Sequence, residues 1–174
     1  MPNSPQLVRS ASWTVDFFSG CYVGQTPAGG CNLTPNAAGV FQEQDLSGRR
    51  LNNAPPITAN GGLLYSFSAT EGIGVDLTFD AEYSDSYATN LRQSPLDRQG
   101  AFTKINAGVR LFDVSRRWEL SLLARNITDE YIYSNSNTVT FTGSGTGTAA
   151  GRIGDTAASV TRGREFLASL AYRF

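Results

Sequence analysis

The sequence predicts an all-β fold, an antiparallel transmembrane β-barrel to which this chain contributes about six strands. Two observations predict it: apolar side chains recur at every second position in six segments, and long and short connections alternate between those segments. The last segment, residues 161–174, keeps one apolar face from Phe166 to its end. That face consists of Phe166, Ala168, Leu170, Tyr172 and Phe174.

A strand that finishes on Tyr172 and Phe174 needs surroundings that favour aromatic rings. A free terminus frays in water unless it is held, whereas the interface of a bilayer attracts aromatic side chains. The closing segment therefore favours contact with lipid.

The other five segments alternate in the same way. Residues 73–83 are the most regular, with Val75, Leu77 and Phe79 on one face and Asp76 and Asp80 on the other. Their length of about ten residues suits a tilted strand that crosses a bilayer. The expected strands are residues 7–18, 57–69, 73–83, 103–111, 118–125 with a continuation as far as Tyr133, and 161–174.

The connections alternate in length. Residues 20–56, 84–100 and 134–158 form long loops, and residues 70–72 and 113–117 form short turns. Barrels of the outer membrane have short periplasmic turns and long outer loops. With that orientation two aromatic girdles are expected: Phe67, Trp118, Tyr172 and Phe174 at the end of the short turns, and Tyr83 and Tyr87 at the other end.

Composition excludes several classes of function. The chain has no run of about 18 apolar residues for a membrane helix, and its net charge of −1 offers no basic stripe for nucleic acid. It contains no histidine, which removes the usual catalytic triads, zinc sites and neutral-pH proton shuttle. We expect no catalytic, cofactor-binding or metal-binding residue and no enzymatic activity.

Cys21 and Cys31 lie in a loop rich in glycine and proline. A metal site would need a second pair of ligands, and the spacing does not suit a redox motif, so we expect a disulfide in an oxidising compartment.

The acidic face of residues 73–83 has two interpretations. Asp76, Asp80 and Glu82 could form a cation site or a hydrated lumen wall, and the lack of further ligands favours the wall. A register that places Arg110 opposite Asp76 and Lys104 opposite Glu82 would pair opposite charges across this face.

Two other segments have competing interpretations. Residues 143–147 have the glycines of a phosphate-binding loop but not its strand, lysine or helix, so a flexible loop is expected. Tyr131 and Tyr133 could stack on a ligand at the outer mouth or pack within a girdle.

Three stretches in order resemble the C-terminal part of TonB-dependent outer-membrane receptors. They are Gly48-Arg-Arg-Leu-Asn-Asn-Ala-Pro55, Trp118-Glu-Leu-Ser-Leu-Leu-Ala-Arg-Asn-Ile-Thr-Asp129 and the closing strand with Phe166, Tyr172 and Phe174. The resemblance implies a 22-stranded barrel, of which residues 1–174 would be the C-terminal portion. Phe166, Tyr172 and Phe174 would then carry the signal read by the barrel-assembly machinery.

The same resemblance implies a function and partners. The expected protein resides in the bacterial cell outer membrane, contacts outer-membrane lipid, and takes up a scarce nutrient such as a ferric siderophore. Its energy would come from the TonB complex, acting through a plug domain that is absent here.

Residues 1–12 lack the apolar core of a secretory signal, so we expect a fragment of a longer protein without its signal peptide. Two alternatives stay open. A small outer-membrane barrel or adhesin would need more strands, and a soluble β-sandwich binding module would bury the apolar faces against each other.

Overall fold

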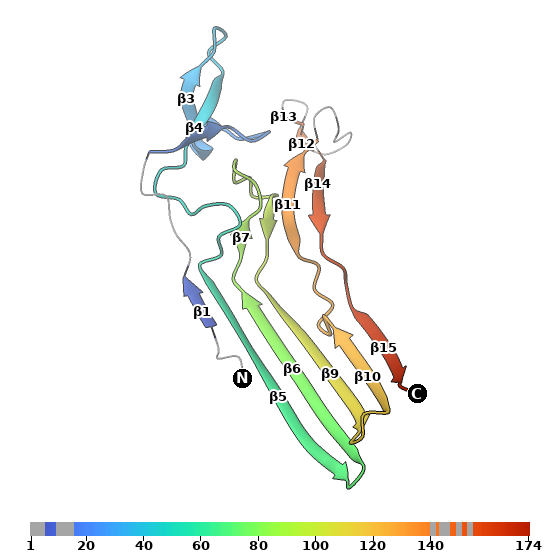
Figure 1. Ribbon diagram of the computed structural model, residues 1–174. Helices are drawn as coiled ribbons and strands as arrows, with labels where there is room; N and C mark the ends of the chain where they lie inside the picture. Colours follow the sequence, from blue (N-terminus) through green and yellow to red (C-terminus); the bar gives the residue numbers. More distant parts are fainter. Residues whose placement is uncertain (1–5, 10–15, 140–141, 143–146, 149–150, 153–154) are drawn as a thin grey trace.

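Antiparallel strands make up the computed structural model, which describes residues 6–9, 16–139, 142, 147–148, 151–152 and 155–174. The main sheet has six strands in the order β1-β5-β6-β9-β10-β15, and each neighbouring pair is antiparallel (Figure 1). The bounds are β1 Gln6–Arg9, β5 Ile57–Thr70, β6 Ile73–Ser84, β9 Phe102–Asp113, β10 Trp118–Arg125 and β15 Glu165–Tyr172. The predicted all-β antiparallel fold is confirmed.

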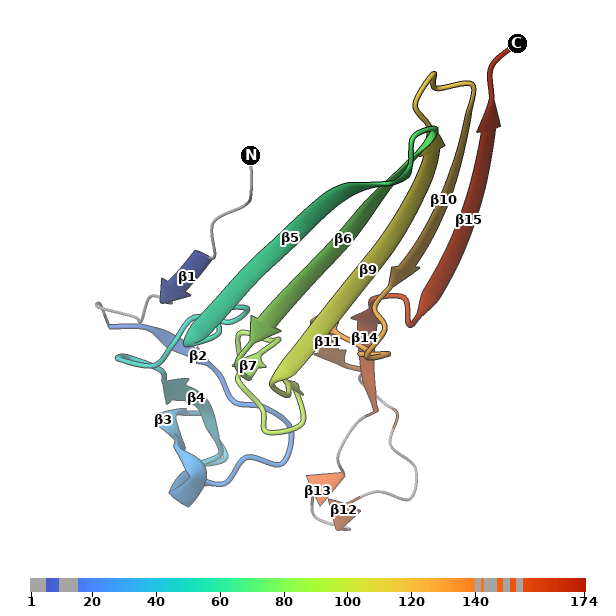
Figure 2. The same ribbon diagram turned by 90° about the horizontal axis from the view of Figure 1, so that it is seen from below.

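Short turns and long connections lie at opposite ends of this sheet. Figures 1 and 2 show the β5–β6 and β9–β10 turns and the C-terminus at one end, with every smaller element at the other. The sheet is a single curved layer in Figure 2. The predicted alternation of long and short connections is therefore confirmed.

The long connections contain short paired strands. Strands β2 (Phe18–Gly20), β4 (Phe41–Asp45) and β3 (Cys31–Pro35) form a three-stranded sheet, and the 3-10 helix η1 (Pro27–Gly29) lies between β2 and β3 in the chain. Strand β7 (Tyr87–Ala88) pairs with β8 (Arg98–Gln99), β11 (Tyr133–Thr138) with β14 (Thr156–Val160), and β12 (Gly147–Thr148) with β13 (Gly151–Arg152).

Two predicted strands are corrected. The segment 7–18 contributes only β1 to the main sheet, and Phe18 instead begins β2 in another sheet; residues 10–15 lie outside the described part of the chain. The fifth strand ends at Arg125 and does not reach Tyr133, because Asn126 adopts a positive φ of 51°, which is incompatible with a continuing strand.

The register divides the sheet into an apolar face and a polar face. Directly opposed residues share a face, and Phe67, Val75 and Leu111 are opposed in this way on three successive strands. We define the apolar face by Leu63, Tyr65, Phe67, Val75, Leu77, Phe79, Ile105, Val109, Leu111, Trp118, Leu120, Leu122, Phe166, Leu170 and Tyr172. The opposite face, which we call the polar face, carries the polar side chains of Asn60, Ser66, Asp76, Asp80, Glu82, Lys104, Asn106, Arg110, Glu119, Ser121, Arg125, Glu165 and Ser169, together with Leu64, Phe112, Leu123 and Leu167.

The apolar face remains largely exposed. Leu63 is 64% exposed, Phe166 75% and Leu170 74%, although each side chain is large and apolar. Monomeric soluble proteins rarely expose an apolar area of this extent. Among the described residues, no second sheet covers this face. These residues therefore do not form the two-layer core of a β-sandwich.

Trp118 and Tyr172 are directly opposed on β10 and β15, and the rings of Tyr172 and Phe174 meet edge to face at 5.1 Å. Tyr65 and Phe67 lie 5.6 Å apart on β5. Aromatic side chains thus gather at the end of the sheet that carries the short turns. No helix in the described part of the chain is long and apolar enough to cross a membrane.

Gly74 provides a test of packing on the polar face. A Cβ added there would collide with the ring of Phe112, whereas one added at Gly72 would meet nothing within 4 Å. We expect Gly74→Ala to lower the free energy of unfolding by about 1–2 kcal/mol, because the ring must move. Urea unfolding in detergent measures this, with Gly72→Ala as the control; equal effects would contradict the packing argument.

Candidate functional site

The most buried charge of the main sheet is Asp76, which is 8% exposed on the polar face. Arg110 lies directly opposite it on β9 and donates to Asp76 Oδ2 through Nε at 2.9 Å and also through Nη2. Glu119 on β10 lies 3.7 Å from Arg110 Nη1. A line of polar side chains therefore crosses the sheet and keeps the buried carboxylate paired.

Glu82 and Lys104 form a second pair nearer the long connections. Lys104 Nζ lies 2.8 Å from Glu82 Oε2, and their side chains are 31% and 48% exposed. The two predicted cross-strand pairs are thus confirmed. Among the described residues no group of histidine, cysteine or acidic side chains could hold a metal ion. Asp76 and Glu82 instead pair with the cationic side chains of Arg110 and Lys104.

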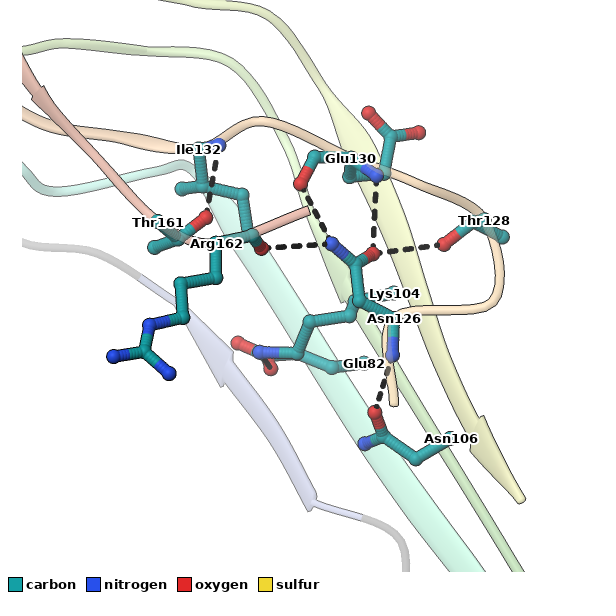
Figure 3. Close-up of polar contacts among 9 residues, drawn as sticks. All are labelled: Glu82, Lys104, Asn106, Asn126, Thr128, Glu130, Ile132, Thr161 and Arg162. Atoms are coloured by element: carbon teal, nitrogen blue, oxygen red, sulfur yellow. Dashed lines mark hydrogen bonds and ion pairs between the residues drawn. The ribbon is translucent and has the colours of Figure 1, made fainter. Parts of the chain in front are cut away.

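Asn126 organises the end of β10 (Figure 3). Its side chain is 5% exposed, and Nδ2 donates to the carbonyls of Glu130 at 2.8 Å and Arg162 at 3.2 Å. Its Oδ1 accepts from the Glu130 N–H at 3.0 Å and the Thr128 hydroxyl at 3.5 Å, and its own N–H donates to Asn106 Oδ1 at 2.9 Å. Asparagine tolerates the left-handed backbone that this turn requires.

Asp129 completes a clamp on the chain just before β15. Its Oδ1 accepts from the Arg164 N–H at 2.8 Å, while Asn126 holds the carbonyl of Arg162. Gly163 lies between them, and a Cβ there would meet Asp129 Oδ1 at 2.8 Å and the Tyr131 hydroxyl at 2.9 Å. The Asn126–Asp129 turn lies in the stretch 118–129 that the sequence analysis singled out. It therefore fixes the position of the backbone of residues 161–164.

A pocket of about 440 Å³ opens beside this clamp. Its polar lining comes from four neighbouring strands of the polar face and from residues 161–163. The charged and amide side chains are those of Asp80, Lys104, Asn106, Arg125, Arg162 and Glu165. We call it the Arg125 pocket. Such a volume is in the range of small-molecule sites.

The long connections are held to one another by buried polar contacts. Ser136 of β11 donates to Asp97 Oδ1 at 3.0 Å and shares a hydrogen bond with Thr89. All three side chains are at most 3% exposed. Because a buried polar group without a partner is costly, these bonds fix β11 against the connection between β6 and β9.

Gln44 joins the loop that contains the cysteines to the same connection. It is 1% exposed, donates to the carbonyls of Gly20 at 3.2 Å and Arg92 at 2.8 Å, and accepts from Gln25 Nε2 at 2.9 Å. The first and second long connections are therefore one packed unit.

Two groups in these connections have shifted pKa values. Burial raises the pKa of Tyr87, and the charge of Glu82 adds to the effect. The neutral phenol donates to the carbonyl of Tyr133 at 3.1 Å. Hydrogen bonds from the side chain and then the backbone of Ser47 lower the pKa of Asp45. Neither shift creates a nucleophile or a general base near the Arg125 pocket.

Cys21 and Cys31 are joined in a disulfide, with their Cα atoms 5.6 Å apart. Cys31 is buried at the start of β3, next to the Gln44 contacts. We expect Cys21→Ser with Cys31→Ser to destabilise this loop by about 2 kcal/mol, because the open loop gains chain entropy. Faster hydrogen exchange of β3 and β4 amides with unchanged exchange in β6 is the expected result. Unchanged exchange in β3 and β4 would contradict it.

The remaining predicted site residues are spread over the sheet. Phe166, Tyr172 and Phe174 are exposed near the sheet edge formed by β15, and Tyr131 lies against Gly163. Tyr133 begins β11, where its N–H donates to Gln99 Oε1 at 2.6 Å. Residues 143–146 of the glycine-rich loop lie outside the described residues. The sequence reasoning did not single out Arg125, Asp97 or Gln44, which belong to no periodic or spaced motif.

The chain resembles one solved structure in fold. It is the crystal structure of the ferric yersiniabactin uptake receptor FyuA from Yersinia pestis, with a TM-score of 0.55 and 13% sequence identity. The match covers 70% of this chain and 17% of that receptor, so this chain corresponds to less than a fifth of its length. No protein-family model and no curated protein sequence matches. At this identity the similarity concerns the fold alone.

Proposed function

We propose that this chain is part of the barrel wall of a TonB-dependent receptor that takes up a scarce nutrient, such as a ferric siderophore, across the bacterial outer membrane. One observation carries the proposal: an exposed apolar face extends over five strands, opposite a polar face whose buried charge is paired. A sheet with lipid on one side and a hydrated lumen on the other requires this division. The similar fold of a ferric yersiniabactin uptake receptor supports it.

Energetics favour lipid as the environment of the apolar face. Each leucine or phenylalanine moved from water to an apolar environment gains roughly 1.5–3 kcal/mol. Leu63, Phe79 and Leu170 are among the side chains that would gain it. In the bilayer, the edges at β1 and β15 need partner strands, because unpaired backbone groups there cost several kcal/mol each.

The orientation assigns roles to the two ends of the sheet. In this proposal the short turns face the periplasm, the packed long connections face outwards, and Trp118, Tyr172 and Phe174 lie at the inner interface. Phe166, Tyr172 and Phe174 serve as the assembly signal. The TonB complex supplies energy through a plug domain carried elsewhere in the protein.

The lipid contact can be tested with the fluorescence of Trp118. Trp13→Phe leaves Trp118 as the sole tryptophan. In vesicles with brominated lipids, we expect the strongest quenching when bromine lies near the headgroups, since Trp118 is at the sheet end. A chain that stays monomeric in buffer without detergent, with unquenched fluorescence, would favour a soluble binding module and refute the proposal.

Transport is tested in the bacterium. Deletion of the gene should abolish growth when a ferric siderophore is the sole iron source, while growth on free iron salts continues. If growth on every ferric siderophore tried is unchanged, the uptake role is wrong and a small barrel or adhesin becomes the better interpretation.

A further inference from the structure

The geometry points to the Arg125 pocket as a binding site for a hydroxycarboxylate, an oxygen-rich anion that carries both a carboxylate and a hydroxyl group. This inference rests on the proposed function, because it names the class of ligand that the polar face would receive. The pocket lies on the polar face at the ends of β6, β9, β10 and β15, beside the long connections.

Among the described residues, Arg125 is the cation of the pocket without a carboxylate partner, whereas Lys104 and Arg162 each contact one. Lys104, Arg125 and Arg162 line the pocket against only two carboxylates, Asp80 and Glu165. Arg125 is exposed and has no ion pair or side-chain hydrogen bond with any residue that the structure describes. An arginine offers a planar fork of donors that matches a carboxylate in two simultaneous hydrogen bonds.

Arg162 can form a second contact with the carboxylate of the ligand. It lies 3.2 Å from Glu165, but its side chain is 88% exposed, and a surface pair of this kind is worth about 1 kcal/mol or less. A carboxylate of a ligand can therefore compete with Glu165. Lys104 is paired with Glu82 at 2.8 Å, so that carboxylate balances its charge.

Asp80 is the residue of the pocket that would bind the hydroxyl group of the ligand. It is exposed, lines the pocket, and makes no hydrogen bond or ion pair within the described residues. A lone carboxylate beside cations would repel a simple anion but accepts a hydrogen bond from a hydroxyl group. Its register partner Asn106 is held by the Asn126 N–H, so the amide next to it is fixed.

The wall of the pocket is set before any ligand arrives. The Asn126 and Asp129 clamp fixes the backbone on both sides of Gly163, and Gly163 itself adds no side chain to the opening. A site that is fixed in advance loses less entropy on binding. The clamp holds Arg162 through its backbone carbonyl, so its side chain can be changed without breaking the clamp.

The test uses L-malate, a hydroxydicarboxylate, and succinate, which lacks only the hydroxyl. Calorimetric titration of the whole chain in a neutral detergent at low salt should show malate binding at least fivefold more tightly than succinate. Arg125→Gln with Arg162→Gln should weaken malate binding at least tenfold. The matched control is Arg173→Gln at the opposite end of β15, and it should change the affinity less than twofold.

Asp80→Ala separates the two parts of the inference. Loss of the negative charge should tighten the binding of succinate, and loss of the acceptor oxygens should abolish the preference for malate. Absence of malate binding, or an equal loss in the Arg173→Gln control, would overturn the inference. If Trp118 is quenched by lipid and malate does not bind, this inference alone fails; if malate binds to a chain that stays out of lipid, the proposed function fails and the pocket stands.

Discussion

Replacing Asp76 with asparagine is expected to lower the free energy of unfolding of the sheet by about 3 kcal/mol. The carboxylate is 8% exposed and holds Arg110 through two donors, so the variant leaves Arg110 with the longer contact to Glu119, at 3.7 Å. Breaking one partner of a buried ion pair costs roughly 3–5 kcal/mol, and the 41% exposure of Arg110 places this pair at the low end. Urea unfolding in detergent micelles, followed by tryptophan fluorescence, measures the loss.

A double-mutant cycle assigns the effect to the pair. Asp76→Asn combined with Arg110→Gln should cost less than the sum of the single changes, with a coupling of about 1–3 kcal/mol. The Glu82 and Lys104 pair is the internal control, because its half-exposed side chains predict a coupling below about 1 kcal/mol. Equal coupling in the two pairs would show that burial does not decide the strength of the Asp76 contact.

The parts of the fold that follow a two-residue period could be predicted from the sequence. Alternation in residues 73–83 fixes which side chains share a face, and a face with Asp76 on it needs a cation opposite, which Arg110 supplies in the observed register. The predicted end of the strand that begins at Trp118 was wrong, because the two-residue period carries no information about where the backbone turns. A pattern that continues past Arg125 cannot show that Asn126 turns the chain, because the positive φ depends on contacts with Arg162, which is 36 residues away.

The candidate site was less predictable for the same reason. Asp80 and Arg125 are unremarkable in their own strands, and the pocket exists only because β6, β9, β10 and β15 place them on one face beside residues 161–163. The buried Thr89, Asp97 and Ser136 cluster joins two loops that have no periodicity. Only long-range pairing brings such residues together, and a single sequence does not contain it.

Asn126→Ala is expected to be the most damaging single change, lowering the free energy of unfolding by about 4 kcal/mol. The substitution removes four part-buried side-chain hydrogen bonds, including those to the carbonyls of Glu130 and Arg162. Each lost hydrogen bond costs about 0.5–1.5 kcal/mol, and the left-handed backbone costs alanine about 1–2 kcal/mol more. Hydrogen exchange should show the Glu130 and Ile132 amides losing protection first.

Asn126→Gly separates the two causes. Glycine adopts a φ of 51° without strain, so this variant should lose only the part of the stability that the amide bonds supply. Asn32→Ala, at an exposed position of β3 with no side-chain hydrogen bond to the part of the chain that the structure describes, should change stability by less than about 0.5 kcal/mol. If Asn126→Ala leaves β15 exchange and malate binding unchanged, the clamp does not position residues 161–164. The presence of Asn126 and Asp129 in residues 118–129 would then need a different physical explanation.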